Sequence, residues 1–267
     1  MRRILCAVTL MVLWISPTLA ASCGNSAKGF ESWLAEFKRS AVAQGISPRT
    51  VSAALDGVRY DSKVVRLDRS QKSFKLSFDE FRKRRAPQGT INAGRRQLSA
   101  NQRLLARVEK TYGVAPEVIV AIWGLETGFG GFSGNMSVFR SLATLAYDCR
   151  RSGFFTTELL HALLIVDRGD MSVSAMRGAW AGELGQTQFL ASNYVRFAVD
   201  FDGDGRRDLI RSRADVFAST ANYLRRKGWQ PGGDWSPGTH NYGVLREWNR
   251  AEVYRQTIAY FATEIRR

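Results

Sequence analysis

The stretch around which this chain is organised is AIWGLETGFG, residues 121–130. Just upstream, Pro116 occupies a first helical position, which proline favours. The apolar residues that follow have helical spacing: Val118, Ile119, Ala121, Ile122 and Leu125. Gly128 and Gly130 then end the helix. The pattern predicts an almost entirely apolar helix that carries one acid, Glu126, in its last turn.

Two effects disfavour a charge on Glu126 at this position. The C-terminal end of a helix dipole is negative, and the aromatic rings of Trp123 and Phe129 solvate a carboxylate poorly. Both effects predict a raised pKa, which suits a general acid near neutral pH. The alternative is an ordinary glutamate at a fraying helix end that reaches water.

Several further motifs follow this stretch in a fixed order. They occupy residues 142–147, 150–151, 154–155, 181–189, 199–205, 221–224 and 228–229. Together with residues 121–130, this ordered set resembles the membrane-bound lytic transglycosylase B family of peptidoglycan-cleaving enzymes. The likeness runs from about residue 30 to the C-terminus and is densest between residues 112 and 229.

The apolar periodicity predicts a mainly α fold. Helical patterns cover residues 30–41, 48–55, 74–81, 97–112, 158–166, 192–199, 214–226 and 249–267, with loops at 87–89 and 228–238. The resemblance sharpens this prediction to a lysozyme-like α+β core. We expect that core to span residues 111–267, with an N-terminal helical region, residues 21–110, packed on it.

Residues 1–20 predict a secretory signal peptide. Arg2 and Arg3 form its basic start, residues 4–15 its apolar centre and residues 17–20 its small-residue end. We therefore expect the mature protein in the periplasm, away from nucleic acid. Without this leader the net charge falls from +15 to +13, which favours anionic partners.

Removal of the leader leaves two cysteines, Cys23 and Cys149. In an oxidising compartment two cysteines most simply pair, and such a disulfide would stabilise the fold by on the order of 3 kcal/mol. The alternative is lipidation of Cys23, because residues 19–23 loosely resemble a lipoprotein cleavage box. Ala20 stands where that box has a larger aliphatic residue. Membrane attachment is expected only if Cys23 is lipidated.

Histidine-based catalysis is nearly excluded, since the chain has only His161 and His240 and no zinc or nucleophile-elbow motif. Carboxylate chemistry remains, and ordinary glycosidases need two carboxylates. Glu183 is the nearest second candidate, but the family typically has a small residue there, so we do not predict it to be catalytic. The resemblance implies that Glu126 alone acts as acid and then as base, with the muramoyl C6 hydroxyl attacking C1 to give a 1,6-anhydro end.

The resemblance also implies a set of substrate-binding residues. Gln188 matches an active-site glutamine, and its alternative is a core amide bonded to backbone. Aromatic and polar positions of the glycan groove are matched by Tyr223, Trp248, Asn249 and Tyr254, each of which alone fits a core residue equally well. Arg151, with Arg150, matches an arginine pair that could meet substrate carboxylates. Ala179 stands where the family has serine, which removes one hydroxyl from the expected site.

The segment Asp200-Phe201-Asp202-Gly203-Asp204-Gly205 matches the first half of an EF-hand calcium loop. Asp200, Asp202 and Asp204 would supply side-chain oxygens, Arg206 its backbone carbonyl and Asp215 a displaced last ligand. The usual closing position holds Arg211. The alternative is an Asp/Gly turn held by its own hydrogen bonds. Any ion here would be structural, and the chemistry itself requires no cofactor.

The leading functional hypothesis is a periplasmic lytic transglycosylase that acts on peptidoglycan glycan strands, alone or beside other cell-wall enzymes. A hydrolytic muramidase is the first alternative and needs a second carboxylate. A non-catalytic peptidoglycan-binding protein is the second, and it gives no reason for Glu126 and Gln188 to occur together.

Overall fold

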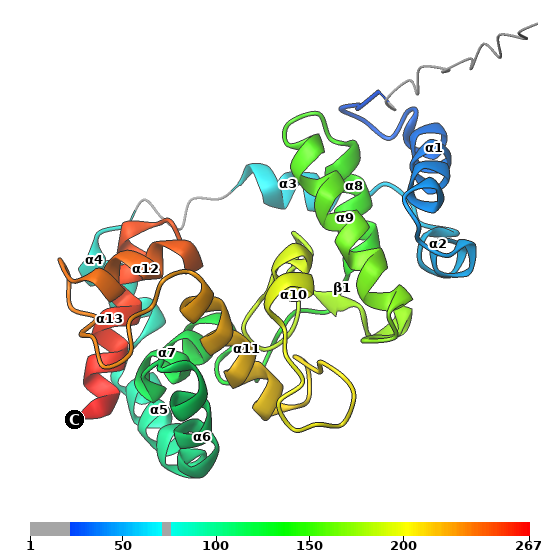
Figure 1. The fold of residues 1–267 in the computed structure, drawn as a ribbon. Helices are drawn as coiled ribbons and strands as arrows, with labels where there is room; N and C mark the ends of the chain where they lie inside the picture. Colours follow the sequence, from blue (N-terminus) through cyan, green and yellow to red (C-terminus); the bar gives the residue numbers. More distant parts are fainter. Residues whose placement is uncertain (1–21, 71–75) are drawn as a thin grey trace, which may run out of the picture.

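The computed structural model describes residues 22–70 and 76–267; the predicted leader and Phe74 lie outside the described residues. The fold is mainly α with one small sheet, as predicted (Figure 1). Its first helices are α1 (Phe30–Ala43), α2 (Pro48–Leu55), α3 (Ser62–Arg69), α4 (Phe78–Arg85), α5 (Gln88–Ala100), α6 (Gln102–Tyr112) and α7 (Pro116–Thr127). The rest are α8 (Val138–Tyr147), α9 (Ser152–Asp167), α10 (Ala191–Phe197), α11 (Arg213–Arg226), α12 (His240–Trp248) and α13 (Glu252–Arg266). The strands β1 (Met136–Ser137) and β2 (Arg177–Gly178) pair antiparallel.

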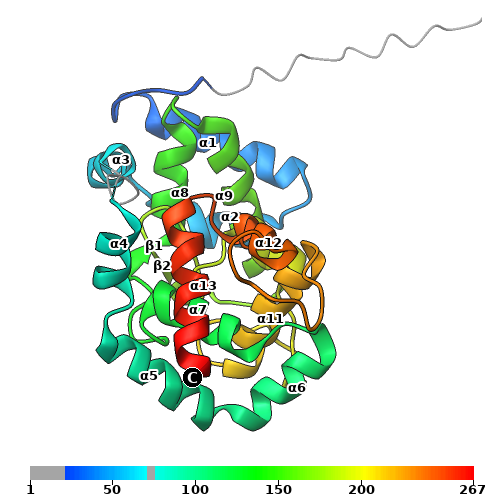
Figure 2. The same ribbon diagram turned by 90° about the vertical axis from the view of Figure 1, so that its left-hand side faces the viewer.

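Helix α7 is the central element of the core. Every residue from Val118 to Leu125 is buried, which an almost wholly apolar helix requires. Trp123 is enclosed by aromatic rings and lies 5.0 Å from the Phe217 ring of α11. Helices α5, α6, α11 and α13 pack around α7, and Figure 2 shows α13 lying along it with α4, α5 and α6 in an outer arc. The predicted helix is confirmed, and the αL conformation of Gly128 ends it.

The second half of the molecule is built on α8 and α9, which pack against each other. Helices α1, α2 and α3 cover this pair, and α10 packs on α9 (Figure 1). The buried Tyr147 ring at the end of α8 joins the rings of Phe30 and Trp33 from α1. The predicted N-terminal region thus divides: α1–α3 lie on α8 and α9, whereas α4–α6 lie on α7, α11 and α13.

A disulfide joins Cys23 to Cys149, with the two Cα atoms 5.0 Å apart. The same tail is held by backbone bonding, since the Gly24 N–H donates to the Tyr147 carbonyl at 2.9 Å. The Tyr147 hydroxyl in turn donates to the carbonyl of Lys28. These contacts fix the segment before α1 against the C-terminal end of α8.

Two helix predictions were wrong in detail. The expected loop at 87–89 is the start of α5, because Pro87 at the N-cap position opens a helix without losing a hydrogen bond. The single helix expected at 97–112 is interrupted at Asn101, whose side chain donates to the Gln97 carbonyl at 2.7 Å. The expected last helix, residues 249–267, is α13, whereas α12, which ends just before Asn249, was not predicted.

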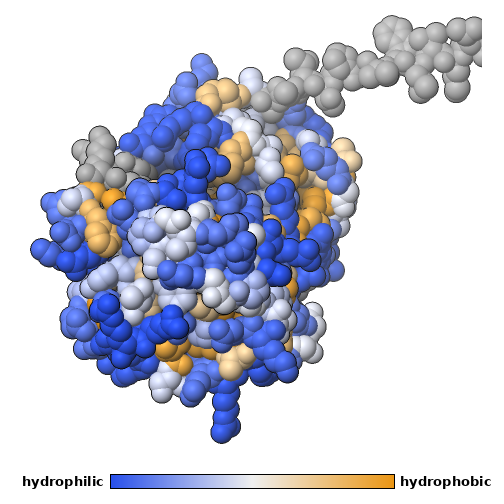
Figure 3. Space-filling view, turned by 60° about the vertical axis from the view of Figure 1, so that its left-hand side comes forward, coloured by the Kyte–Doolittle hydropathy of each residue, from blue (hydrophilic) through white to orange (hydrophobic). Residues whose placement is uncertain are grey.

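Hydrophilic residues cover most of the face drawn in Figure 3. Among the described residues, no helix combines the length and the apolar character that a membrane span requires.

Candidate active site

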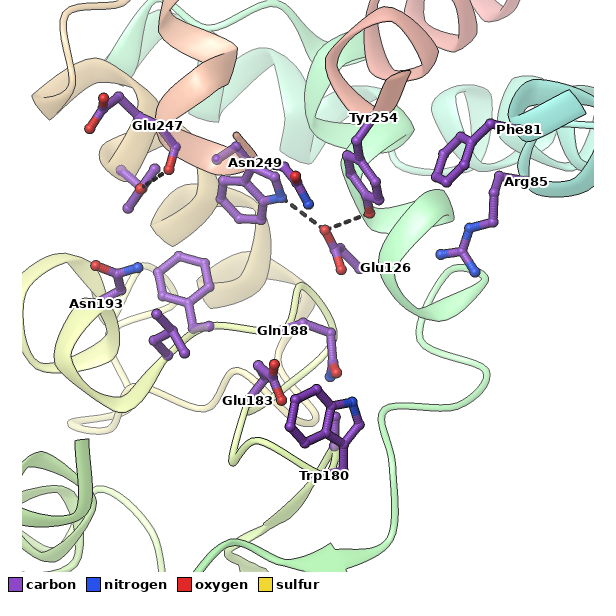
Figure 4. Close-up of a pocket in the computed structure, with 15 residues that line it drawn as sticks. Phe81, Arg85, Glu126, Trp180, Glu183, Gln188, Asn193, Glu247, Asn249 and Tyr254 are labelled. Carbon is purple, nitrogen blue, oxygen red and sulfur yellow. Dashed lines mark hydrogen bonds between the residues drawn. The ribbon is translucent and has the colours of Figure 1, made fainter. Parts of the chain in front are cut away.

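Glu126 lies in a groove between the two halves of the molecule, with a volume of about 570 Å³ (Figure 4). Helices α4, α7, α10, α11, α12 and α13 and the loop after β2 contribute to its walls. The lining residues are Phe81, Arg85, Glu126, Ala179, Trp180, Glu183, Gln188, Phe189, Leu190, Asn193, Tyr223, Glu247, Trp248, Asn249 and Tyr254. A groove of this size, open to solvent and lined by aromatic and polar side chains, suits a polar polymer.

The Glu126 carboxyl group is half-buried and held from one side. Trp248 Nε1–H donates to its Oε1 at 2.9 Å, and the Tyr254 hydroxyl donates to the same oxygen at 2.7 Å. Both donors come from the α12–α13 corner, and Figure 4 shows the Tyr254 hydroxyl directed at Glu126. This arrangement fixes one carboxyl oxygen and directs the group into the groove.

Burial raises the pKa of Glu126 above its usual value. The hydrogen bonds from Trp248 and Tyr254 oppose this shift, as does the charge of Arg85, while the charge of Glu183 adds to it. The direction agrees with the sequence-based prediction. The pKa of Tyr254 is raised well above its usual value by burial and by the Glu126 charge, so its hydroxyl stays a donor.

Aromatic packing positions the α12–α13 corner. The Trp248 ring lies 5.6 Å from the Phe189 ring and 5.3 Å from the Tyr223 ring, both edge-to-face. The Tyr223 hydroxyl donates to the Glu247 carbonyl at the end of α12. The groove is lined by all four residues that the family resemblance assigned to a glycan groove: Tyr223, Trp248, Asn249 and Tyr254.

Gln188 also lines the groove, and its backbone takes an unusual conformation with φ of 53°. Its Nε2 donates to the carbonyls of Ser133 and Gly185, at 3.1 and 2.9 Å. Both amide hydrogens are therefore used within the protein. The part of the amide left for a ligand is Oε1, a hydrogen-bond acceptor.

The loop that carries Gln188 is anchored to α7 through Gln186. The Trp123 Nε1–H donates to Gln186 Oε1 at 2.8 Å, and the Thr127 hydroxyl donates to the Gln186 carbonyl at 2.6 Å. The Gln186 side chain also donates to the Ile210 carbonyl at 2.7 Å. These bonds fix the distance between Gln188 and the helix that carries Glu126.

The sequence did not identify several lining residues, above all Arg85. It belongs to a run of basic residues, 82–85, whose pattern fits a solvated face and a contact with an anionic polymer equally well. Its guanidinium donates to the Leu125 carbonyl at the end of α7, and its charge acts on Glu126. Trp180, Asn193 and Glu247 were also missed, because nothing in their local sequence separates them from ordinary core or surface residues.

Comparison with known proteins assigns the chain to a family. The family described as the transglycosylase SLT domain matches residues 29–238. The chain belongs to this family.

Two known proteins are more than 30% identical to this chain over the aligned residues. The membrane-bound lytic murein transglycosylase B of Escherichia coli (strain K12) is 39% identical over 129 residues, 48% of this chain and 36% of that protein. The match thus spans little more than a third of that relative's length. SltB3 of Pseudomonas aeruginosa, solved with NAG-NAM-pentapeptide, is 33% identical with a TM-score of 0.83, over 89% of this chain and 79% of SltB3.

A second solved structure shows likeness of fold alone. It is the Escherichia coli lytic transglycosylase SLT35 in complex with calcium, which is 22% identical to this chain with a TM-score of 0.78. The alignment covers 94% of this chain and 97% of SLT35.

The arginines predicted beside the groove of this transglycosylase domain are engaged elsewhere. Arg150 and Arg151 both bind the buried carboxylate of Asp68, and Arg151 also lies 4.7 Å from the Phe155 ring. Neither lines the groove. Burial raises the pKa of Glu183, and the charge of Arg151 partly opposes this shift.

The half EF-hand segment brings three carboxylates together. Ligand oxygens of Asp200, Asp202 and Asp204 lie within 4.8 Å of one another, and all three residues are exposed. Asp215 is fully buried and differs from these three, because its two oxygens accept the N–H groups of Phe201 and Asp208, each at 2.7 Å. The carboxylates of Asp200, Asp202 and Asp204 fit the oxygen-only preference of calcium. Asp215 instead holds the backbone of the loop through its two hydrogen bonds.

Proposed function

We propose that this chain is a lytic transglycosylase that cleaves the β-1,4 bond between N-acetylmuramic acid and N-acetylglucosamine in peptidoglycan. The observation that carries the proposal is Glu126, a half-buried carboxyl group with a raised pKa, held by two donors in a sugar-sized groove. Membership of the transglycosylase SLT family and the similarity to SltB3 support the substrate class.

In the proposed reaction Glu126 acts twice. As an acid it protonates the glycosidic oxygen, and burial favours the protonated form that this step needs. As a carboxylate it then accepts the proton of the muramoyl C6 hydroxyl while that oxygen attacks C1. The substrate acetamido group stabilises the positive charge at C1. The product is a 1,6-anhydromuramoyl end, and no water is consumed.

The groove residues take supporting roles in this proposal. Gln188 presents Oε1 to a sugar hydroxyl or amide hydrogen, while Tyr223 and Trp248 offer ring edges and faces to the glycan. Asn249 supplies a polar group beside the acid. Tyr254 orients Glu126, and Arg151 acts only at a distance, through its charge.

We expect cleavage to depend on a free C6 hydroxyl on the muramoyl residue, because that oxygen is the nucleophile. Peptidoglycan acetylated at this position should release no anhydro fragments, whereas the same material after mild de-O-acetylation should release them. Mass spectrometry of the soluble fragments measures this. The proposal fails if both substrates give only hydrated reducing ends, or if the protein binds de-acetylated sacculi and releases nothing.

The pH profile should respond to Tyr254→Phe. The lost hydroxyl donates to Glu126 and favours its charged form, so its removal raises the pKa of Glu126 further. Activity requires protonated Glu126 and is lost as the pH rises through this pKa. The alkaline limb of kcat/KM should therefore move to higher pH. Tyr242→Phe, whose hydroxyl binds Glu252 outside the groove, is the control and should leave the limb in place.

We also propose that Asp200, Asp202 and Asp204 bind one structural calcium ion, with Arg206 contributing its carbonyl. Calcium at 100 times its dissociation constant should stabilise the protein by about 2.7 kcal/mol, which raises Tm by roughly 5–10 °C in a chain of this size. Asp204→Asn should abolish the shift, and magnesium should not reproduce it. Equal melting curves in calcium and in chelator would show that the loop is an Asp/Gly turn.

The proposed setting is the periplasm, with glycan strands as the substrate. The positive charge of the chain suits a polymer that carries muramoyl and peptide carboxylates.

A further inference from the structure

Three acidic side chains line the groove: Glu126, Glu183 and Glu247. Glu247 is exposed at the end of α12, and its carboxylate lies 3.0 Å from the Lys227 ammonium group. Its charge is thus neutralised at the rim. Glu183 is the acid that shares the interior of the groove with Glu126.

The backbone around Glu183 is tightly fixed. The Ala179 N–H donates to the Glu183 carbonyl at 3.1 Å, and bridges pair Leu184 with both Gly178 and Phe189. Gly178 has no room for a side chain here, since a Cβ would lie 1.9 Å from the Glu183 carbonyl oxygen. A rigid loop therefore presents this side chain to the groove.

The Glu183 carboxyl group itself is half-buried and lightly bound. Its Oε2 accepts the Ala181 N–H at 3.2 Å, and the backbone of Glu183 itself also hydrogen-bonds to the carboxyl group, but no side chain in the described ranges donates to it. Figure 4 shows the carboxyl group beside Trp180, directed into the groove on the far side of Gln188 from Glu126. Glycosidases that use water need a second carboxylate across the scissile bond from the acid.

Electrostatic repulsion favours a state in which one of the two carboxyl groups is protonated and the other is ionised. Burial raises the pKa of Glu183, and the charge of Arg151 opposes this shift. The charge of Glu183 in turn raises the pKa of Glu126. Two like charges in one groove disfavour the doubly ionised state, so a singly protonated pair persists to higher pH. One acid and one base is the pairing that hydrolysis requires.

We propose that Glu183 is the general base of a second, hydrolytic branch at this site, which rests on the proposed transglycosylase function. Glu126 donates its proton to the leaving O4 of N-acetylglucosamine as the C1–O4 bond breaks. A water molecule on the Glu183 side attacks C1 and loses a proton to the Glu183 carboxylate. The product is a hydrated reducing end, and solvent returns the proton from Glu183 to Glu126. The muramoyl C6 hydroxyl and this water compete for the same C1.

The test is digestion of peptidoglycan in water labelled with heavy oxygen, with a boiled-enzyme control for exchange at existing reducing ends. The wild-type protein should give anhydro fragments together with hydrated fragments that carry one labelled oxygen. Glu183→Gln, which keeps the shape of the side chain, should lower the ratio of hydrated to anhydro product at least about tenfold, as loss of a general base does. Glu109→Gln, which changes a carboxyl group on α6 outside the groove, should leave the ratio unchanged.

Formation of the anhydro product in the same reaction shows that the variant protein is folded. If Glu183→Gln does not fold, Glu183→Ala is the second variant. Anhydro fragments from the wild type without any labelled product would overturn the hydrolytic branch and leave the transglycosylase intact. An equal ratio in Glu183→Gln and wild type would remove Glu183 from the branch. If the wild type yields neither product, both proposals fall.

Discussion

Glu126→Gln is expected to lower the rate of fragment release by about 10³–10⁴-fold while glycan binding persists. The amide oxygen can still accept from Trp248 and Tyr254, so the shape of the groove is retained. The amide cannot supply the acidic proton or later take one up, and general acid–base catalysis by one group contributes roughly 10²–10⁴-fold. Because Glu126 serves in both steps, the loss should fall at the upper end. Initial rates on purified sacculi and a sedimentation assay for binding measure the two quantities.

Glu109→Gln is the matched control for this substitution, since Glu109 lies on α6 outside the groove and its pKa is also raised by burial. It should keep wild-type rates. If Glu126→Gln kept more than about a tenth of the activity, the decrease would be smaller than loss of a general acid produces. The catalytic acid would then be a different residue.

Loss of the Cys23–Cys149 disulfide should give the largest change in stability. The bond links residues 126 positions apart, and closing a loop of that length lowers the conformational entropy of the unfolded chain, which stabilises the fold by about 5 kcal/mol. In a chain of this size that corresponds to a fall in Tm of about 10–20 °C. Calorimetry of the oxidised protein with and without reductant measures the effect.

The double variant Cys23→Ala, Cys149→Ala is the control for this experiment, and its Tm should be low and insensitive to reductant. A lipid-modified Cys23 cannot pair, so a mature protein with an acyl mass on its N-terminus and a Tm unchanged by reductant would contradict the disulfide.

The sequence was sufficient where the determining interactions are local. The apolar run from Val118 to Leu125 and the glycines after Thr127 are enough to predict α7 and the place of Glu126 at its end. The pairing of Cys23 with Cys149 was predicted from the number of cysteines that remain after the leader and from the expected oxidising compartment. The loop prediction at 87–89 was wrong because proline is common at the start of a helix as well as in loops. The local sequence contains no feature that distinguishes these two structures.

The groove depended on contacts that no local pattern contains. Trp248 and Tyr254 lie 122 and 128 positions from Glu126 in sequence, and only the packing of α13 on α7 brings them to its carboxyl group. The family resemblance supplied these positions. It supplied neither Arg85 nor a role for Glu183, because Arg85 sits in an unremarkable charge run and Glu183 replaces the small residue that the family typically has.

The most direct test of the account is the mass of the fragments that the mature protein releases from purified peptidoglycan in water labelled with heavy oxygen. The account predicts that most fragments are about 18 Da lighter than their hydrolytic counterparts and carry no label, and that Glu126→Gln releases none of them, because one acid serves both steps. Fragments that all carry a labelled reducing end would contradict internal attack by the C6 hydroxyl and would identify the protein as a muramidase.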